Sequence, residues 1–222
     1  MEKYLAEFPV QQTDISNSQY PASLKRIDDP PSTLYWRGKF LEPIEQCFAI
    51  VGTRHCSDYG KETAFNFSSD LTRAGLTIVS GLALGVDSWA HKGALEASQA
   101  SRTVAVLGTG LAEAAFYPQE NLKLARQILK QGGCLISELA NETAGSHFTF
   151  PRRNRIIAAI SLGVLVVEAK IKSGSLITAN WAKKYRKPVF AVPGSIHNSN
   201  SKGCHILIKQ GHKLAESASD IL

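Results

Sequence analysis

Residues 47–52 read CFAIVG, a short apolar and partly β-branched run that ends in glycine. Such runs are typical of strands that are buried on both faces of a parallel sheet. Five further segments have the same character: LTIVSG (76–81), TVAVLG (103–108), CLIS (134–137), VLVVEA (164–169) and VFAVPG (189–194). Four of the six runs lead directly into glycine, and together they predict the buried strands of one sheet.

Stretches with helical periodicity separate these runs. They cover residues 59–74, 86–98, 120–131, 152–162 and 175–184. An alternation of strand and helix repeated this often predicts parallel pairing with right-handed crossovers. The expected fold is therefore an α/β, doubly wound, mostly parallel sheet with helices on both faces, an extended Rossmann-like fold. Ligands of such sheets bind beyond the carboxyl ends of the strands, so the loops there are the first candidates for a site.

Length and proline placement set the expected domain boundaries. The chain has 222 residues, which is enough for one large α/β domain or two small ones. Residues 1–45 are polar and carry five prolines, so we expect an irregular lead-in with at most short elements. The Rossmann-like domain is expected to span residues 46–222.

Composition favours a cytoplasmic protein that makes no contact with a membrane. No apolar run approaches the ~20 residues that a membrane span needs, and no secretory leader is recognisable. The four cysteines are scattered, without a C-x-x-C pair, so neither a disulfide framework nor a metal site is expected.

The net charge of +6 is unevenly distributed along the chain. Residues 150–190 carry nine basic side chains and one acidic one, so the remaining residues sum to a slight negative charge. A basic segment of this kind favours a polyanionic partner. The alternative is a solvated face whose counterions lie elsewhere in the chain.

The basic segment begins with FPRRNRIIAAIS (150–161). Three arginines and an asparagine (152–155) precede an apolar run that is typical of a buried helix face. Pro151 suits the first position of a helix, so the arginines are expected in the first turn. Each cation there should cost roughly 0.3–1 kcal/mol, because the N-terminus of a helix already carries a partial positive charge. We therefore expect the arginines to have a negative partner.

Loops after other predicted strands carry further donors. GTRHCSDYG (52–60) places Arg54 two residues after Gly52 and near the start of a helix. A flexible backbone and a cation at a helix N-terminus are suited to binding phosphate. KIKSGSLITA (170–179) places Lys172 before Ser-Gly-Ser at another helix start, where backbone N–H groups, hydroxyls and a charge can form an anion pocket. A capping serine beside a flexible glycine explains only part of that pattern. In SGLALGVDSWAH (80–91), Asp87 is expected to cap a helix.

Several catalytic and nucleotide-binding motifs are absent from the sequence. GTGLAEAAFYP (108–118) has Glu113 where a dinucleotide fingerprint needs glycine. There is no P-loop, no G-x-S-x-G, no H-E-x-x-H and no clustered aspartate pair for magnesium. A site rich in donors and poor in bases or nucleophiles favours binding over catalysis, so we expect no enzymatic activity, no cofactor and no metal.

Six blocks of the sequence resemble one known family. VGTR…YG, VSGLALGVDSWAH, AVLGTGL…YPQEN, FPRRNRIIAAIS, VVEAKIKSGSLITA and VFAVPG occur in the order and at roughly the spacing of the DNA-processing protein A family (DprA/Smf). The resemblance runs from about Tyr20 to Leu222. It implies a homodimeric Rossmann-like domain that binds and protects single-stranded DNA. It also implies loading of the RecA recombinase during natural transformation, without enzymatic turnover.

Matched position by position, the resemblance implies DNA contacts in three loops. The implied residues are Gly52, Arg54, Arg153, Asn154, Arg155, Lys172, Ser173, Gly174 and Ser175. Arg152 is a further candidate in the arginine turn. Phe148 and Phe150 flank this turn and are suited either to stacking on bases or to core positions under the loop.

The resemblance also implies where two copies pair. CHILIKQGHKL (204–214) lies in the region through which the family dimerises, and it carries Ile206, Leu207 and Ile208. We expect these three side chains to form an apolar patch that self-pairs about a two-fold axis. Burial of all three within one monomer is the alternative.

An enzymatic alternative shares this Rossmann variant. The lysine-decarboxylase-like phosphoribohydrolases act on nucleotide monophosphates and carry the signature P-G-G-x-G-T-x-x-E. VPGSIHNSNSKGC (192–204) offers Pro193-Gly194 but neither the Gly-Thr pair nor the glutamate. Single-stranded DNA is therefore the favoured ligand.

Overall fold

The structure is a computed structural model that describes residues 4–41, 46–98 and 101–222. The strands in these ranges are β1 (Gln11–Asp14), β2 (Thr33–Gly38), β3 (Cys47–Val51), β4 (Thr77–Ser80), β5 (Thr103–Val106), β6 (Cys134–Ser137), β7 (Val164–Val166), β8 (Val189–Ala191) and β9 (Lys213–Leu214). The α-helices are α1 (Ala22–Lys25), α2 (Asp58–Arg73), α3 (Val86–Ala97), α4 (Leu122–Lys130), α5 (Thr149–Ile160), α6 (Gly174–Lys184) and α7 (Lys202–Lys209). Short 3-10 turns lie at Gln119–Asn121, Ser199–Ser201 and Ala218–Asp220.

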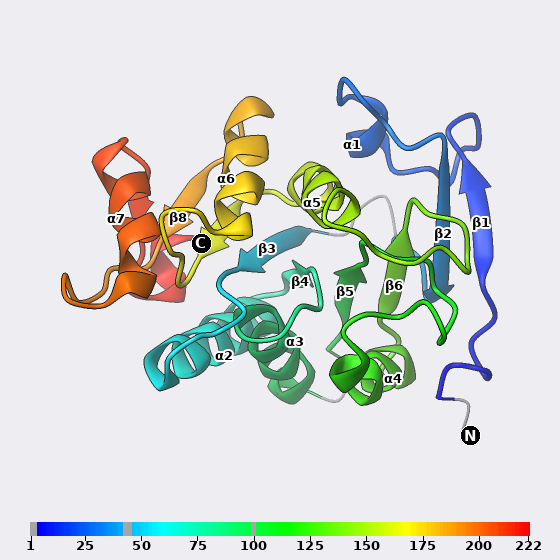
Figure 1. Cartoon of the computed structure of the whole chain (residues 1–222), viewed down its shortest axis with the longest axis horizontal. Helices are drawn as coiled ribbons and strands as arrows, with labels where there is room; N and C mark the ends of the chain where they lie inside the picture. Colours follow the sequence, from blue (N-terminus) through cyan, green and yellow to red (C-terminus); the bar gives the residue numbers. More distant parts are fainter. Residues whose placement is uncertain (1–3, 42–45, 99–100) are drawn as a thin grey trace.

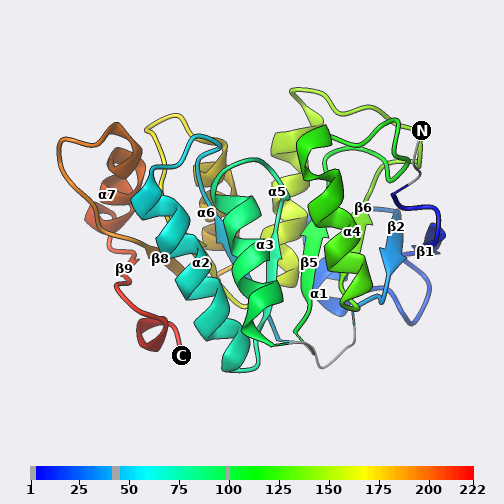
Figure 2. The ribbon, with the colours of Figure 1, turned by 90° about the horizontal axis from the view of Figure 1, so that it is seen from below.

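The strands form one sheet in the order β1-β2-β6-β5-β4-β3-β7-β8-β9. Pairing is parallel from β6 through to β9, and antiparallel where β2 joins β1 and β6. Helices α2, α3 and α4 cover one face, and α1, α5 and α6 cover the other (Figures 1 and 2). The predicted doubly wound, mostly parallel α/β fold is confirmed, including all six predicted strands.

The direction of winding reverses between β3 and β7. The chain runs outward from β3 through β4 and β5 to β6, crosses back through α5 to β7, and continues outward on the other side through β8. Val51 at the end of β3 lies beside Val166 at the end of β7. The loops that follow these strands therefore diverge from one point, where a doubly wound sheet opens a binding crevice.

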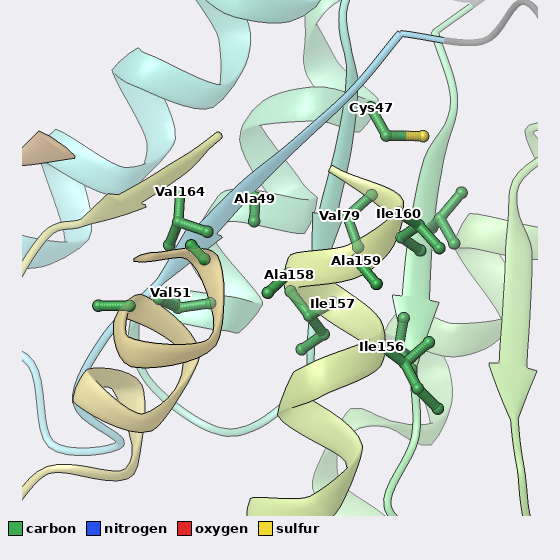
Figure 3. Close-up of a cluster of buried hydrophobic side chains, with 14 of the residues drawn as sticks. Cys47, Ala49, Val51, Val79, Ile156, Ile157, Ala158, Ala159, Ile160 and Val164 are labelled. Carbon is green, nitrogen blue, oxygen red and sulfur yellow. The ribbon is translucent and has the colours of Figure 1, made fainter. Parts of the chain in front are cut away.

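Helix α5 packs its apolar half against the sheet (Figure 3). All five residues from Ile156 to Ile160 are buried, as the sequence predicted. They share one core cluster with residues of β3, β4 and β7, among them Ala49, Val79 and Val164. This burial fixes the position of the arginines one turn earlier in the same helix.

Within residues 4–41, the short strands β1 and β2 belong to the main sheet. Strand β2 pairs with β6, with Trp36 opposite Ile136, and its inward side chains Leu34 and Trp36 are buried. Buried Arg37 donates to the carbonyls of Leu5, Phe8 and Leu111 and so ties the preceding segment to the domain. The short elements expected there thus extend the sheet, because β6 would otherwise present an unpaired edge.

Helix α5 also begins earlier than predicted. It starts at Thr149 rather than at Pro151, with Phe148 at the N-cap position, and Ser146 and Thr149 hydrogen-bond each other across that position. The Ser146 hydroxyl accepts from the Thr149 N–H at 3.2 Å, and the Thr149 hydroxyl accepts from the Ser146 N–H at 2.8 Å. The arginines consequently begin at the fourth helical residue, beyond the first turn.

Candidate nucleic-acid interface

A cavity of about 330 Å³ lies beyond the carboxyl ends of β3, β4 and β7. Residues of four segments that are distant in sequence line it: Val51–His55, Ala83 with Asp87, Phe150–Ile157 in part, and Lys170–Thr178 in part. It thus sits at the reversal point of the sheet, where the topology leads one to expect a ligand. Gly52, Arg54, Arg153, Asn154, Lys172, Ser173, Gly174 and Ser175 all line it, so the structure brings together eight of the eleven predicted DNA-binding residues.

The loop after β3 brings Arg54 to the cavity. A side chain at position 52 would place its Cβ 2.5 Å from Val86 Cγ2, so only glycine fits there. The next residue is held by a hydrogen bond of 2.7 Å from the Thr53 N–H to the Glu168 carbonyl. Arg54 follows as an exposed side chain whose guanidinium lies 5.5 Å from the centre of the Phe150 ring. The backbone of the loop after β3 is therefore fixed, while the Arg54 side chain that it carries is open to solvent.

The N-terminus of α6 supplies the opposite wall. Ser173 caps the helix by accepting from the Ser175 N–H, and the two serine hydroxyls lie 2.8 Å apart. A Cβ at Gly174 would have no neighbour within 4 Å, so the backbone here is open to a ligand. Lys170 and Lys172 are exposed at the same wall. Helix N–H groups, hydroxyls and ammonium groups at one wall favour a bound anion.

Arg153 forms the buried floor of the cavity. The residue is 6% exposed, and its guanidinium donates to the carbonyls of Gly81 and Val106 and to Asn154 Oδ1. Asp87, equally buried, accepts from the Gly81 N–H at 3.1 Å and attracts Arg153 electrostatically. Burial lowers the pKa of Arg153 to about 10, although Asp87 opposes that shift. At neutral pH Arg153 thus remains a cation with protein partners.

One expectation for this region is corrected. Asp87 does not cap α3, because Gly85 occupies the cap position and the Asp87 side chain instead closes the loop before the helix. Arg153 lines the cavity while it is held by protein partners, and its expected contact with DNA stays a prediction. Buried His91 lies in the same polar layer and bonds Thr103 Oγ1 at 2.8 Å. Burial, with Arg153 nearby, lowers the pKa of His91 to about 3, so this histidine is neutral at physiological pH.

Asn154 joins the two helices that flank the cavity. Its Nδ2 donates to the Gly174 carbonyl at 3.1 Å, and its Oδ1 accepts from the Arg153 Nε. The residue is 9% exposed. Asn154 therefore positions the start of α6 and the Arg153 side chain, and only its edge faces the cavity.

Arg152 and Arg155 do not line the cavity. Arg155 is 1% exposed and forms two hydrogen bonds of 2.7 Å with the Glu138 carboxylate. Its Nε lies 3.3 Å from Asp29 Oδ2. Arg152 is exposed and pairs with the same two acids, 3.2 Å from Asp29 and 3.7 Å from Glu138. Both arginines face acids of the chain itself, and their expected contact with DNA stays a prediction.

Two of the six remaining cations of the basic segment also have partners within the protein. Lys184 lies 2.6 Å from Asp28 Oδ2. Lys187 donates to the Ala159 and Ser161 carbonyls at the end of α5. Burial lowers the pKa of Lys187 to about 8. Counterions elsewhere in the chain, the alternative stated above, therefore account for a large part of this charge.

A buried carboxylate braces the outer side of the site. Glu168 follows β7 and is 1% exposed. It accepts from the Ser57 N–H at 2.9 Å and from the Ser57 hydroxyl at 2.7 Å, and Asn198 donates to it at 3.3 Å. It thereby holds the start of α2 and the loop after β8 beside the Arg54 loop. Glu168 is the one acidic residue of the basic segment 150–190. Its place at the end of an apolar strand could have indicated a site residue, because ligands of such sheets bind at the strand ends.

The aromatic residues separate into two environments. Phe148 is 73% exposed, packs on His147 and does not line the cavity. Phe150 is half-buried and lines it. Tyr117, which sequence reasoning did not consider, lies 5.5 Å from Phe150 between ring centres. Lys170 was also missed as a site residue, although it is a cation directly after a strand that the sequence did identify.

The predicted dimer residues have different environments. Leu207 is 3% exposed and belongs to the main core cluster. Ile208 is partly buried against the same cluster. Ile206 is partly exposed on α7. Within one copy, only Ile206 and the outer edge of Ile208 are therefore accessible, and pairing through this region stays a prediction.

The chemistry of the cavity is that of an anion receptor. Its polar lining consists mainly of cations, hydroxyls and helix N–H groups, and its acid, Asp87, is engaged with two backbone N–H groups. Among residues 4–41, 46–98 and 101–222, no group of three or more histidine, cysteine or acidic side chains is placed to hold a metal ion. No helix in this part of the chain is long and apolar enough to cross a membrane.

Comparison with known proteins identifies the family. The model of DNA recombination-mediator protein A matches residues 11–222. This chain belongs to the DprA/Smf family. Protein Smf of Escherichia coli is 43% identical over 203 residues, which are 91% of this chain and 53% of that protein. The chain thus spans about half the length of that relative.

Two solved DprA structures share the fold over almost all of this chain. DNA processing protein A of Streptococcus pneumoniae superposes with a TM-score of 0.85 at 39% identity, over 98% of this chain and 74% of that one. DNA processing protein A of Helicobacter pylori, which binds single-stranded DNA, gives a TM-score of 0.85 at 29% identity, over 99% and 96% of the two chains. The fold assigned above is therefore that of the DprA/Smf family.

Proposed function

We propose that this chain binds single-stranded DNA without catalysing a reaction, with backbone phosphates held in the cavity at the reversal point of the sheet. The observation that carries this proposal is a division among the cations. Arg54, Lys170 and Lys172 are exposed around one cavity beside the N-terminus of α6, whereas Arg152, Arg155 and Lys184 are paired with acids. Exposed cations and N–H groups at one cavity are suited to phosphate.

In the cell, we propose that the protein protects incoming single strands and loads the RecA recombinase onto them during natural transformation. Membership of a recombination-mediator family supports this role. The DNA-binding activity of the Helicobacter pylori relative supports the choice of ligand. We place this activity in the cytoplasm, where the recombinase and the incoming strand meet.

The decisive test compares cavity cations with cations at the far end of α6. Arg54→Ala or Lys172→Ala should weaken binding to an oligothymidine by roughly 1–3 kcal/mol, as expected for a charge-assisted phosphate bond. Both side chains are exposed, so the melting temperature should change little. The matched control is Lys183→Ala with Lys184→Ala, which should change affinity only through a small long-range term. Fluorescence anisotropy measures each dissociation constant. Tight binding that survives at Arg54 and Lys172 but is lost in the Lys183/Lys184 variant would show that the site lies at the opposite edge of the sheet.

Salt and strand type provide a second readout of the same proposal. Contact with about three to five phosphates predicts a slope of log K against log salt near −2 to −4 for single strands. Single strands should be preferred over duplex, because the cavity presents no helix that could enter a groove. A flat salt dependence, a preference for duplex, or release of ribose 5-phosphate from a nucleotide monophosphate would contradict the proposal.

We further propose that the chain forms a homodimer through the outer face of α7. Ile206 is partly exposed there, and Leu214 on the neighbouring edge strand is 43% exposed. Self-pairing of this surface about a two-fold axis would cover both side chains and close the β9 edge of the sheet. Light scattering should give twice the chain mass, and Ile206→Glu should halve it without unfolding the protein.

A further inference from the structure

We infer that Lys187 is an acylation site, whose side-chain amine accepts an acyl group from an acyl phosphate in a cavity separate from the DNA site. This cavity has a volume of about 270 Å³ and lies at the amino end of β3. The cavity around Arg54 and Lys172, the phosphate cavity, lies at the opposite end of the strands. Cys47 at the start of β3 and Ile160 at the end of α5 both line the new cavity and lie close together (Figure 3). We call it the amino-edge cavity.

The Lys187 side chain is held at the wall of the amino-edge cavity. The backbone N–H of Lys187 donates to the Ala182 carbonyl at 2.9 Å, in the turn that ends α6. The Nζ atom donates to the Ala159 and Ser161 carbonyls at the end of α5. An ammonium group carries three N–H bonds, so two are engaged with α5 and the third is available to the cavity that the side chain lines. Loss of that third proton leaves both contacts in place and frees a lone pair for nucleophilic attack.

Burial makes this amine a nucleophile near neutral pH. It lowers the pKa of Lys187 from 10.5 to about 8, because the charged form is desolvated. At pH 8 about half of these amines are therefore uncharged, against roughly 0.4% for a lysine of ordinary pKa. A lysine desolvated in this way is a recognised form of activated nucleophile.

The titratable neighbours of Lys187 leave this shift in place. Cys47 from β3 opposes it, because a thiolate there would attract the ammonium group, but burial is the larger effect. Tyr20, from the loop before α1, also lines the cavity, and burial raises the pKa of Tyr20 to about 12, so its ring is neutral. Within the described ranges 4–41, 46–98 and 101–222, no carboxylate lines the amino-edge cavity to hold Lys187 as a cation.

The remaining lining of the amino-edge cavity suits an acyl group. Leu41 and Leu162 offer apolar contacts to the acyl carbons, and the Ser18 and Ser23 hydroxyls can donate to the acyl oxygen. A volume of about 270 Å³ is several times that of an acetyl group. The product can therefore remain in the cavity without displacing the core.

The reaction is an acyl transfer that needs no oxidant or reductant. The uncharged Nζ attacks the carbonyl carbon of the acyl phosphate, a C–N bond forms, and the C–O bond to the phosphate breaks. The phosphate leaves with the bonding electron pair and takes the proton that the amine loses. The resulting amide has one N–H, so either the Ala159 or the Ser161 carbonyl loses its partner. Acylation therefore weakens the junction between the end of α5 and the segment before β8.

Reaction with acetyl phosphate tests the site. The folded protein is incubated at pH 8 and cut at glutamate residues, and mass spectrometry follows the acetylated fraction of each lysine. Lys187 should react at least about 5-fold faster than Lys183 and Lys209, which are exposed and serve as internal controls. The initial rate at Lys187 should level off above about pH 9, because its amine is then largely uncharged. In the urea-unfolded chain the preference for Lys187 should disappear, because the cavity no longer exists.

Lys187→Arg is the matched variant, because a guanidinium can donate to the same carbonyls but is not acetylated. After equal treatment with acetyl phosphate, the urea midpoint of the unaltered protein should fall by about 0.3 M or more beyond any fall in the variant. The acylation site is overturned if Lys187 reacts no faster than Lys183 and Lys209, or if the preference persists in the unfolded chain. It is also overturned if the rate at Lys187 still rises steeply above pH 9, or if treatment destabilises the variant and the unaltered protein equally.

Discussion

Replacing Arg155 with methionine tests whether this residue stabilises the domain or binds DNA. Its guanidinium forms two hydrogen bonds of 2.7 Å with Glu138, and its Nε donates to the Asp29 carbonyl at 2.9 Å. The Arg155→Met variant fills much of the same volume but leaves the Glu138 carboxylate, whose side chain is 11% exposed, without its main partner.

The expected loss of unfolding free energy follows from the burial of this ion pair. Breaking a buried ion pair by removing one partner costs about 3–5 kcal/mol of unfolding free energy. Arg152 still lies 3.7 Å from Glu138 and compensates in part, so the lower end of that range, about 3 kcal/mol, is expected. With a urea m-value of up to about 3 kcal/mol per molar, the unfolding midpoint should fall by about 1 M or more.

Urea unfolding followed by circular dichroism measures this change, and anisotropy measures DNA affinity under conditions where the variant is folded. Affinity should stay within about 2-fold, because Arg155 does not line the phosphate cavity. The control is Arg152→Met, which removes an exposed pair to the same two acids and should cost less than about 1 kcal/mol. The reasoning is refuted if Arg155→Met unfolds like the control, or if it stays stable and loses DNA binding.

Three further outcomes are expected from the buried polar and apolar groups. In Glu168→Gln, the Ser57 N–H and hydroxyl compete for one acceptor oxygen. Urea unfolding should therefore show that the free energy of unfolding falls by about 1.5–3 kcal/mol. Burial lowers the folded-state pKa of Lys187 from 10.5 to about 8, so the unfolded state binds more protons between these values. The urea midpoint of the unaltered protein should therefore rise relative to Lys187→Met from pH 8 towards pH 10, and a constant difference would contradict this. Leu207→Ala truncates a core side chain and should lower the free energy of unfolding by about 2–5 kcal/mol in the same urea experiment, whereas Ile206→Ala should lower it much less.

The sequence was sufficient for the six central strands of this protein, for the helices between them and for the doubly wound fold class. The run CFAIVG and its five counterparts became strands of one sheet, and the apolar run Ile156–Ile160 became the buried face of α5. Local patterns succeed here because a strand buried on both faces must be apolar throughout, wherever its neighbours lie. The same patterns located the loops after β3 and β7, and hence Gly52, Arg54 and Lys172 to Ser175 at the cavity.

Only the tertiary structure separated the basic residues by role. The arginines at 152–155 are adjacent in sequence, yet successive helical residues point in different directions around the axis, so Arg153 lines the cavity while Arg152 and Arg155 face acids. Those acids lie far along the chain, Asp29 in the segment expected to be irregular and Glu138 after β6. A local sequence pattern cannot predict such a pairing, because it arises only when the segment around α1 and the loop after β6 pack against α5. The choice between a counterion within the chain and one on a nucleic acid is therefore made by packing.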